Sequence, residues 1–178
     1  RCKSRSGSLQ MELEAFPNRH AGETVCILGG APSLPRDLLT IPDECRLIGL
    51  NQHALILPLD YCFFADPRVW YVVQQYQINV ITPYAVIRER EDTLFTSTCP
   101  NVGLSGPMAT WCAGFLGFEE IVVMGCDAYQ ADRRYWHSLE RHGVQGQDCT
   151  PWLTVRDQME RPERVRFTDK ELNKLWHE

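Results

Sequence analysis

The sequence has no run of 18 apolar residues, so it predicts no membrane span. Positive charge is scarce: 18 Lys and Arg stand against 23 Asp and Glu, for a formal net charge of −5. That balance argues against a strongly basic nucleic-acid-binding protein. Residues 1–6 offer no initiating Met and no apolar signal core, so we expect a trimmed start and a cytoplasmic protein.

The sequence also lacks a Cys-x-x-Cys pair, although it contains 8 cysteines. This absence excludes a zinc-ribbon signature, and we expect no metal site. Four of the cysteines stand inside apolar runs, where a free thiol behaves as a small hydrophobic side chain; they are Cys26, Cys62, Cys112 and Cys126. We therefore expect reduced core thiols.

What is present is typical of a globular protein: 178 residues, 44% apolar and 23% charged. Short apolar runs predict strands at residues 24–28, 46–50, 61–65, 79–82 and 121–124. Helical patterns follow at 67–77, after Asp66 as N-cap, at 106–116, and beyond Asp169 near the end. Apolar strands alternating with helices predict a three-layer, Rossmann-like α/β fold with a mainly parallel sheet.

We expect residues 1–178 to form a single α/β nucleotide-binding domain. Residues 1–20 would be a peripheral N-terminal segment, and residues 128–150 a candidate lid loop. Residues 151–178 would form a helical or extended C-terminal segment, serving as a closing subdomain, a dimer surface or neither.

The predicted site begins with the turn after the first strand, because ligands of parallel α/β folds bind beyond the carboxyl ends of the strands. This turn consists of Gly29, Gly30, Ala31, Pro32 and Ser33. Its backbone N–H groups and the Ser33 hydroxyl would suit a phosphate. The pattern is neither G-x-G-x-x-G nor a P-loop with Lys, and an ordinary strand-to-helix turn is the alternative.

Three further groups of polar residues follow the next predicted strands. Asn51 and Gln52 can donate to and accept from a base or ribose, or satisfy a turn. Asn51 also stands where a dinucleotide site requires an acid, which argues against a nicotinamide cofactor. Asp66 could hold a ribose, a hydroxyl or a metal, or serve only as N-cap. Ser105 and Gly106 could form a second anion- or sugar-binding turn, or simply cap a helix.

Asp127 and Tyr129 come after the last predicted strand. Asp127 could bind a sugar hydroxyl or a divalent ion, and the Tyr129 hydroxyl could donate a hydrogen bond to a leaving phosphate. The following segment is rich in Arg and aromatic residues and carries His137 and His142, each a candidate general base or an exposed loop residue. These two histidines are five residues apart, so they would not share a helix face, and a two-His zinc site is disfavoured.

The ordered set of these blocks resembles the bacterial sialyltransferase-like fold of glycosyltransferase family 42. It also resembles the related family of the archaeal 6-hydroxymethylpterin diphosphokinase, and most closely the uncharacterised phage proteins of that clan. The blocks are Gly-Gly-Ala-Pro-Ser-Leu, Asn-Gln, a strand-end Asp, a Ser-Gly helix start and Gly-Cys-Asp-Ala-Tyr-Gln, over about residues 24–142. Gly30 and Ala31 replace the frequent central Asn-Gly of the first loop, so the identity of the donor stays open. The chain is also shorter than the sialyltransferases, with a reduced acceptor-binding lid, which disfavours sialic acid.

The resemblance implies a role for each block. Residues 30–33 would wrap the nucleotide phosphates, Asn51 and Gln52 would contact the nucleotide or donor sugar, and residues 105–106 would hold the base or ribose. Asp127 and Tyr129 would lie at the transferred group. His137 would deprotonate the acceptor, because Trp-His follows the Gly-x-Asp block in phage relatives.

We therefore expect a nucleotide-dependent transferase, most specifically a glycosyltransferase with a nucleotide or nucleotide-sugar donor. The acceptor stays open, a phage-modified DNA base being one candidate, and so does the oligomeric state. One alternative is a diphosphokinase that needs Mg²⁺ through Asp66 or Asp127. Another is a non-catalytic nucleotide-binding phage protein.

Overall fold

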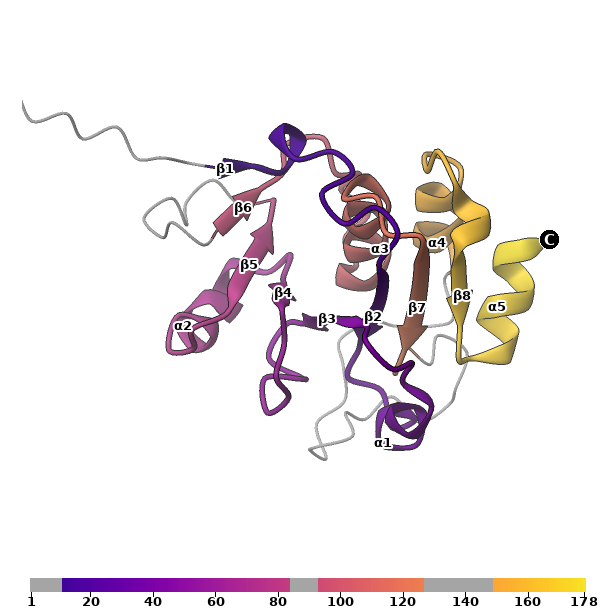
Figure 1. Cartoon of the computed structure of the whole chain (residues 1–178), viewed down its shortest axis with the longest axis horizontal. Helices are drawn as coiled ribbons and strands as arrows, with labels where there is room; N and C mark the ends of the chain where they lie inside the picture. Colours follow the sequence, from indigo (N-terminus) through magenta and orange to yellow (C-terminus); the bar gives the residue numbers. More distant parts are fainter. Residues whose placement is uncertain (1–10, 84–92, 127–148) are drawn as a thin grey trace, which may run out of the picture.

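The computed structural model describes residues 11–83, 93–126 and 149–178, and all eight of their strands join one parallel sheet in the order β1-β6-β5-β4-β3-β2-β7-β8 (Figure 1). The strands are β1 (Met11–Glu12), β2 (Thr24–Leu28), β3 (Arg46–Leu50), β4 (Tyr61–Phe63), β5 (Asn79–Thr82), β6 (Thr93–Phe95), β7 (Glu120–Met124) and β8 (Val165–Phe167). The α-helices are α1 (Leu34–Asp37), α2 (Trp70–Val73), α3 (Ser105–Phe115), α4 (Thr150–Arg156) and α5 (Lys170–His177). Short 3-10 turns are η1 (Leu13–Ala15), η2 (Leu38–Thr40), η3 (Pro67–Val69) and η4 (Pro162–Arg164).

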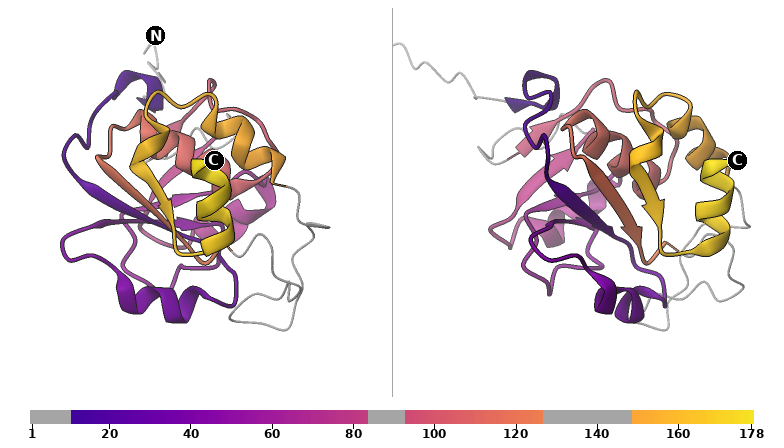
Figure 2. Two further views of the ribbon diagram at one scale, coloured as in Figure 1. Left: turned by 90° about the vertical axis from the view of Figure 1, so that its right-hand side faces the viewer. Right: turned by 45° about the vertical axis from the view of Figure 1, so that its right-hand side comes forward.

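The predicted three-layer, Rossmann-like α/β architecture is confirmed. Successive residues of a strand point to opposite faces of a sheet. Val25 and Ile27 of β2 accordingly pack in the cluster that contains α3, α4 and α5, whereas Cys26 and Leu28 pack against α1. The α2 helix packs on the same face as α1, further along the sheet. Helices thus cover both faces, with α1 on one side and α3 and α4 on the other (Figure 2).

The connections place a topological switch point between β2 and β7. From β2 the chain moves outward through β3, β4 and β5 to β6, and α3 then returns it to β7 on the other side of β2. The loops after β2 and β7 therefore lead to opposite halves of the sheet. In open α/β sheets, ligands bind at the carboxyl edge beside such a point.

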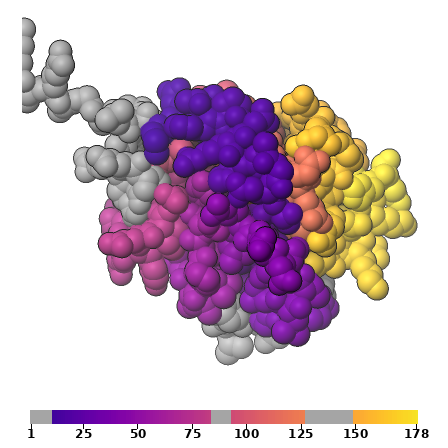
Figure 3. Space-filling view, viewed as in Figure 1, coloured from indigo at the N-terminus to yellow at the C-terminus, as the bar shows by residue number. Residues whose placement is uncertain are grey.

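Both ends of the described chain belong to the sheet. Leu13 of η1 is fully buried and β1 pairs with β6, so residues 11–13 join the sheet edge and contribute one side chain to the core. At the other end, β8 pairs with β7, and the C-terminal segment lies directly beside β7 in one continuous surface (Figure 3). Residues 150–178 thus complete the main sheet.

Two boundaries differ from the sequence prediction. The helix expected over residues 67–77 begins as a 3-10 turn and ends at Val73. Only Val69 and Val73 are buried in this stretch, so no buried side chain supports the helix beyond Val73. The strand expected over residues 61–65 ends at Phe63. The predicted N-cap at the last helix is confirmed, since the Asp169 carboxylate accepts from Leu172 N at 2.8 Å.

The seven cysteines of the described ranges carry free thiols, and burial raises the pKa of the Cys62 thiol to about 12. None of the helices described is long and apolar enough to cross a membrane.

Candidate functional site

A cavity of about 200 Å³ opens at the carboxyl ends of β3 and β4, beside the start of α3. It brings together four residues that the sequence singles out: Asn51, Gln52, Asp66 and Ser105. The remaining lining comes from His53, Ala65, Val69 and Gly103. Three segments far apart in the chain therefore meet at one point of the sheet edge, as parallel strands require.

Asn51 is held in a strained conformation at the end of β3. Its φ of 53° lies in the left-handed region, where Asn is one of the few tolerated residues. Its backbone N–H donates to Phe63 O at 2.8 Å, and its side-chain Oδ1 accepts from the Ser105 hydroxyl at 3.3 Å. This pairing orients the side chain so that Nδ2 is the group left to donate to a ligand.

Asp66 contributes an ionised carboxylate to the same cavity. The N-cap role proposed as an alternative is confirmed, because Oδ1 accepts from Arg68 N at 2.9 Å. The Arg68 guanidinium also donates to both carboxylate oxygens. Hydrogen bonds from the Arg68 side chain and backbone lower the pKa of Asp66 below its ordinary value. The carboxylate is therefore an acceptor at neutral pH.

Ser105 and Gly106 open α3, but neither caps it. Leu104 occupies the N-cap position, and no side chain caps the helix there. Gly106 is needed for packing, since a Cβ at this position would lie 2.9 Å from the Trp152 ring of α4. Ser105 alone of this pair lines the cavity, through the contact with Asn51.

The turn of residues 29–33 does not line this cavity. Gly29 N donates to Met124 O at 2.8 Å and Ala31 N to Gly125 O at 2.9 Å, so two donors expected for a phosphate are used by the end of β7. Pro32 has no N–H to offer. A Cβ at Gly29 would lie 2.2 Å from Gly125 O, so this glycine is required by the close approach of two loops.

Ser33 contacts Asp37, a residue that the sequence motifs did not single out. Its hydroxyl donates to the Asp37 carboxylate at 3.0 Å, and it neither caps α1 nor lines the cavity. Asp37 is 3% exposed and also accepts from Gly125 N at 3.2 Å and the Thr168 hydroxyl at 2.7 Å. One buried charge thus joins α1 to the ends of β7 and β8.

Two opposing effects act on the pKa of Asp37. Burial raises it, but hydrogen bonds from Thr168, Arg36, Gly125 and Ser33 together lower it below its ordinary value. Asp37 also lines a second cavity of about 560 Å³, on the other side of β2 from the Asn51 cavity. The other residues of this second cavity are Arg36, Thr40, Thr168, Asp169, Lys170 and Glu171.

The four residues predicted to be catalytic, Asp127, Tyr129, His137 and His142, lie outside the described residues. Their segment leaves the sheet after Cys126, at the carboxyl edge and beside the switch point. Within the described ranges, no group of three His, Cys, Asp or Glu side chains is arranged to hold a metal ion.

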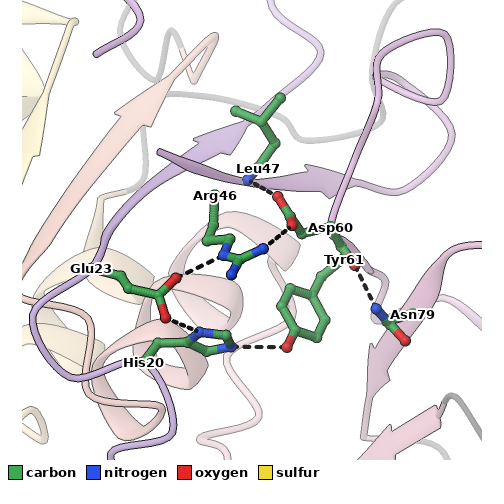
Figure 4. Close-up of polar contacts among 7 residues, drawn as sticks. All are labelled: His20, Glu23, Arg46, Leu47, Asp60, Tyr61 and Asn79. Atoms are coloured by element: carbon green, nitrogen blue, oxygen red, sulfur yellow. Dashed lines mark hydrogen bonds and ion pairs between the residues drawn. The ribbon is translucent and has the colours of Figure 1, made fainter. Parts of the chain in front are cut away.

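The opposite, amino edge of the sheet is closed by a network of side chains (Figure 4). Arg46 donates to Glu23 at 2.7 Å and to Asp60 at 2.8 Å, which fastens β3 to its neighbours. The buried His20 ring lies between Glu23 and the Tyr61 hydroxyl, at 3.0 and 2.9 Å. These polar groups satisfy one another, so this edge offers a ligand little, in contrast to the cavities at the carboxyl edge.

No protein-family model matches the chain, and no curated protein matches it. A solved structure of a protein from Lactobacillus plantarum is similar, with 17% sequence identity and a TM-score of 0.45. The match covers 83% of this chain and 60% of that protein, so this chain spans less than two thirds of its length.

Proposed function

We propose that this chain is a nucleotide-dependent transferase, and most specifically a glycosyltransferase that moves a sugar from a nucleotide-sugar to an acceptor hydroxyl. The observation that carries the proposal is the meeting of Asn51, Gln52, Asp66 and Ser105 around one cavity at the carboxyl edge. Polar side chains that converge at this edge of a Rossmann-like sheet are typical of a nucleotide site.

The chemistry of the cavity fits the nucleoside part of such a donor. The ionised Asp66 is suited to accept hydrogen bonds from ribose hydroxyls, and Asn51 Nδ2 to donate to a base carbonyl or a phosphate oxygen. Arg68 already neutralises the Asp66 carboxylate, so this carboxylate is less suited to bind Mg²⁺. This weakens the alternative of a Mg²⁺-dependent diphosphokinase.

Two cavities on either side of the switch point support transfer between two bound molecules rather than binding of one. In the proposed reaction the donor would occupy the Asn51 cavity, and the acceptor would approach from the Asp37 side. His137 or His142 would take the proton of the acceptor hydroxyl, whose oxygen attacks the anomeric carbon as the bond to the nucleotide phosphate breaks. Tyr129 would stabilise the leaving phosphate, and Asp127 would hold the sugar.

The experiment is a thermal-shift panel of nucleotides and nucleotide-sugars, followed by chromatography of the released nucleotide. A ligand that binds the folded state raises the melting temperature, and we expect at least one nucleotide-sugar to do so. Ser105→Ala should weaken the shift, and Arg46→Lys, at the amino edge, should leave it unchanged. His137→Ala and His142→Ala should identify the base by loss of turnover.

Each other outcome points to a different function. AMP release from ATP that EDTA abolishes would replace the proposal with Mg²⁺-dependent diphosphoryl transfer. Binding without turnover on any acceptor would favour a non-catalytic nucleotide-binding protein. No shift from any nucleotide would overturn the proposal.

A further inference from the structure

Two thiols that the proposed function does not use lie in contact on the face of the sheet that α1 covers. Cys26 stands in the middle of β2, and Cys45 stands immediately before β3. Both belong to the apolar cluster around α1, and the Cys26 S–H donates to Cys45 Sγ at 3.7 Å. The two residues are 19 positions apart in the chain, so the fold makes this contact and local sequence does not.

The two thiols differ in their access to solvent. Cys26 is fully buried, whereas Cys45 is partly exposed. Burial first, and then the neighbouring Cys45, raise the pKa of the Cys26 thiol, so Cys26 keeps its proton at neutral pH. An oxidant that arrives from solvent therefore reaches Cys45 first, and Cys26 is placed to react second.

Cys45 also stands where the chain can move. A disulfide needs its sulfur atoms about 2.05 Å apart and its Cβ atoms about 3.5–4.5 Å apart, so one residue must approach the other. Cys26 is fixed in the sheet, because β2 pairs with both β3 and β7. Cys45 follows a turn at the exposed Asp43 and Glu44 and precedes the first residue of β3. The approach therefore falls to Cys45.

A second pair of described thiols provides a comparison within the same molecule. Cys99 and Cys112 also interact with each other. Both are buried, so an oxidant in solvent reaches neither of them. Contact between two thiols is thus found at two places, but only the pair of Cys26 and Cys45 combines it with access from solvent on one side.

We propose that Cys26 and Cys45 are a redox pair, which a hydroperoxide converts to a reversible disulfide. The Cys45 sulfur attacks one peroxide oxygen and the O–O bond breaks, which with hydrogen peroxide gives a Cys45 sulfenic acid and water. The Cys26 sulfur then attacks the Cys45 sulfur; the S–S bond forms, the S–O bond breaks, and the hydroxyl leaves with the Cys26 proton as water. The two thiols lose two electrons, which reduce the peroxide, and a reduced dithiol restores them by exchange. This site is independent of the proposed transferase activity.

The bond would close a loop over residues 26–45, which contains the turn of residues 29–33, α1 and Asp37. Asp37 lines the cavity of about 560 Å³, so the disulfide would fasten one wall of that cavity to the start of β3. Trypsin can cut this loop after the exposed Arg36. The resulting peptides, residues 20–36 and 37–46, contain one cysteine each, so a link between them identifies this pair alone.

The test treats the reduced full chain with an equimolar amount of hydrogen peroxide. The remaining thiols are blocked with N-ethylmaleimide in denaturant, and the chain is digested with trypsin without reductant. Mass spectrometry should find peptide 20–36 joined to peptide 37–46, two hydrogen atoms lighter than their sum, and dithiothreitol should separate them. The same treatment in urea should give several-fold less of this link, because Cys112 and Cys126 are closer in sequence than Cys26 and Cys45.

Variants test the order of the two steps. Cys26→Ser should leave a sulfenic acid on Cys45, which dimedone captures, and Cys45→Ser should leave Cys26 unoxidised. Cys112→Ala is the matched control and should form the link as the wild type does. Absence of the link in the folded chain, an equal yield in urea, or a dimedone adduct on Cys26 in Cys45→Ser would each overturn the proposal; the mapping of the wild type needs no variant to fold.

Discussion

At the scale of single residues, Asp37 is the charge on which the arrangement of the carboxyl edge depends. Its carboxylate accepts from donors of three segments, Ser33, Gly125 and Thr168, at 2.7–3.2 Å. Asn at this position would place an NH₂ group against those donors. Asp37→Asn should therefore lower the free energy of unfolding by about 2–3 kcal/mol at pH 7, measured by urea denaturation.

The same carboxylate predicts a pH dependence of known sign. Because its pKa is lowered in the folded state, its contribution is present at neutral pH and is lost as the pH falls below about 3.9 and through the folded pKa. The difference between wild type and Asp37→Asn should shrink over that acid range. Asp43→Asn, at an exposed position, should show little difference at any pH. A wild-type-to-Asp37→Asn difference that stays constant into acid would contradict this role.

Two substitutions of Asn51 distinguish the effect of backbone strain on stability from the effect of the side-chain amide on ligand binding. Its φ of 53° suits Gly, whereas a Cβ without a polar group costs about 1–2 kcal/mol there. Asn51→Gly should therefore keep the stability of the wild type, and Asn51→Ala should lower it by about 1 kcal/mol. Both variants lose the side-chain amide and should bind the nucleotide about tenfold more weakly by calorimetry. If Asn51→Gly bound the nucleotide with wild-type affinity, the Asn51 side-chain amide would not be part of the binding site.

Four residues of the Asn51 cavity, Asn51, Gln52, Asp66 and Ser105, could be predicted because each follows a strand or opens a helix, where local sequence gives the position. The other lining residues, His53, Ala65, Val69 and Gly103, were not predicted. Asp37 could not be found in this way. In the sequence it forms a charged pair with Arg36 between Leu34-Pro35 and Leu38-Leu39, and such a pair is typical of the exposed face of a helix. Its burial depends on Thr168, 131 residues further along the chain, and no local pattern reports such a contact.

At the scale of elements, predictability follows burial. The central strands β2 and β7 are covered on both faces, so they appear in the sequence as continuous apolar runs. The strands that the sequence did not predict are β1, β6 and β8, which have two or three residues each. In β8 the exposed Arg166 stands between buried Val165 and Phe167, a pattern too short to distinguish from a loop.

A substitution in the C-terminal helix α5 tests whether residues 150–178 belong to the core. Trp176 is 2% exposed and meets Phe167 and Trp152, with ring centroids 5.3 and 6.3 Å away. Trp176→Ala should lower the free energy of unfolding by about 3–5 kcal/mol in a single cooperative transition. Lys174→Ala, on the exposed side of α5, should change it by less than about 0.5 kcal/mol. A separate early transition for residues 150–178 would show instead that this segment is a detachable unit.

At the scale of the whole molecule, the two edges of the sheet differ in kind. At the amino edge Arg46, Glu23 and His20 belong to a network whose polar groups pair with one another. At the carboxyl edge, cavities of about 200 and 560 Å³ flank β2, and charged side chains line both. This asymmetry places the expected chemistry at the carboxyl edge and leaves the amino edge a structural role.

The most direct measurement is a backbone-amide NMR titration of the ¹⁵N-labelled chain with the nucleotide-sugar that gives the largest thermal shift. We expect the strongest chemical-shift changes at residues 51–53, 65–66 and 103–106. Changes concentrated around His20, Glu23 and Arg46, or none at the three predicted segments at saturation, would contradict it.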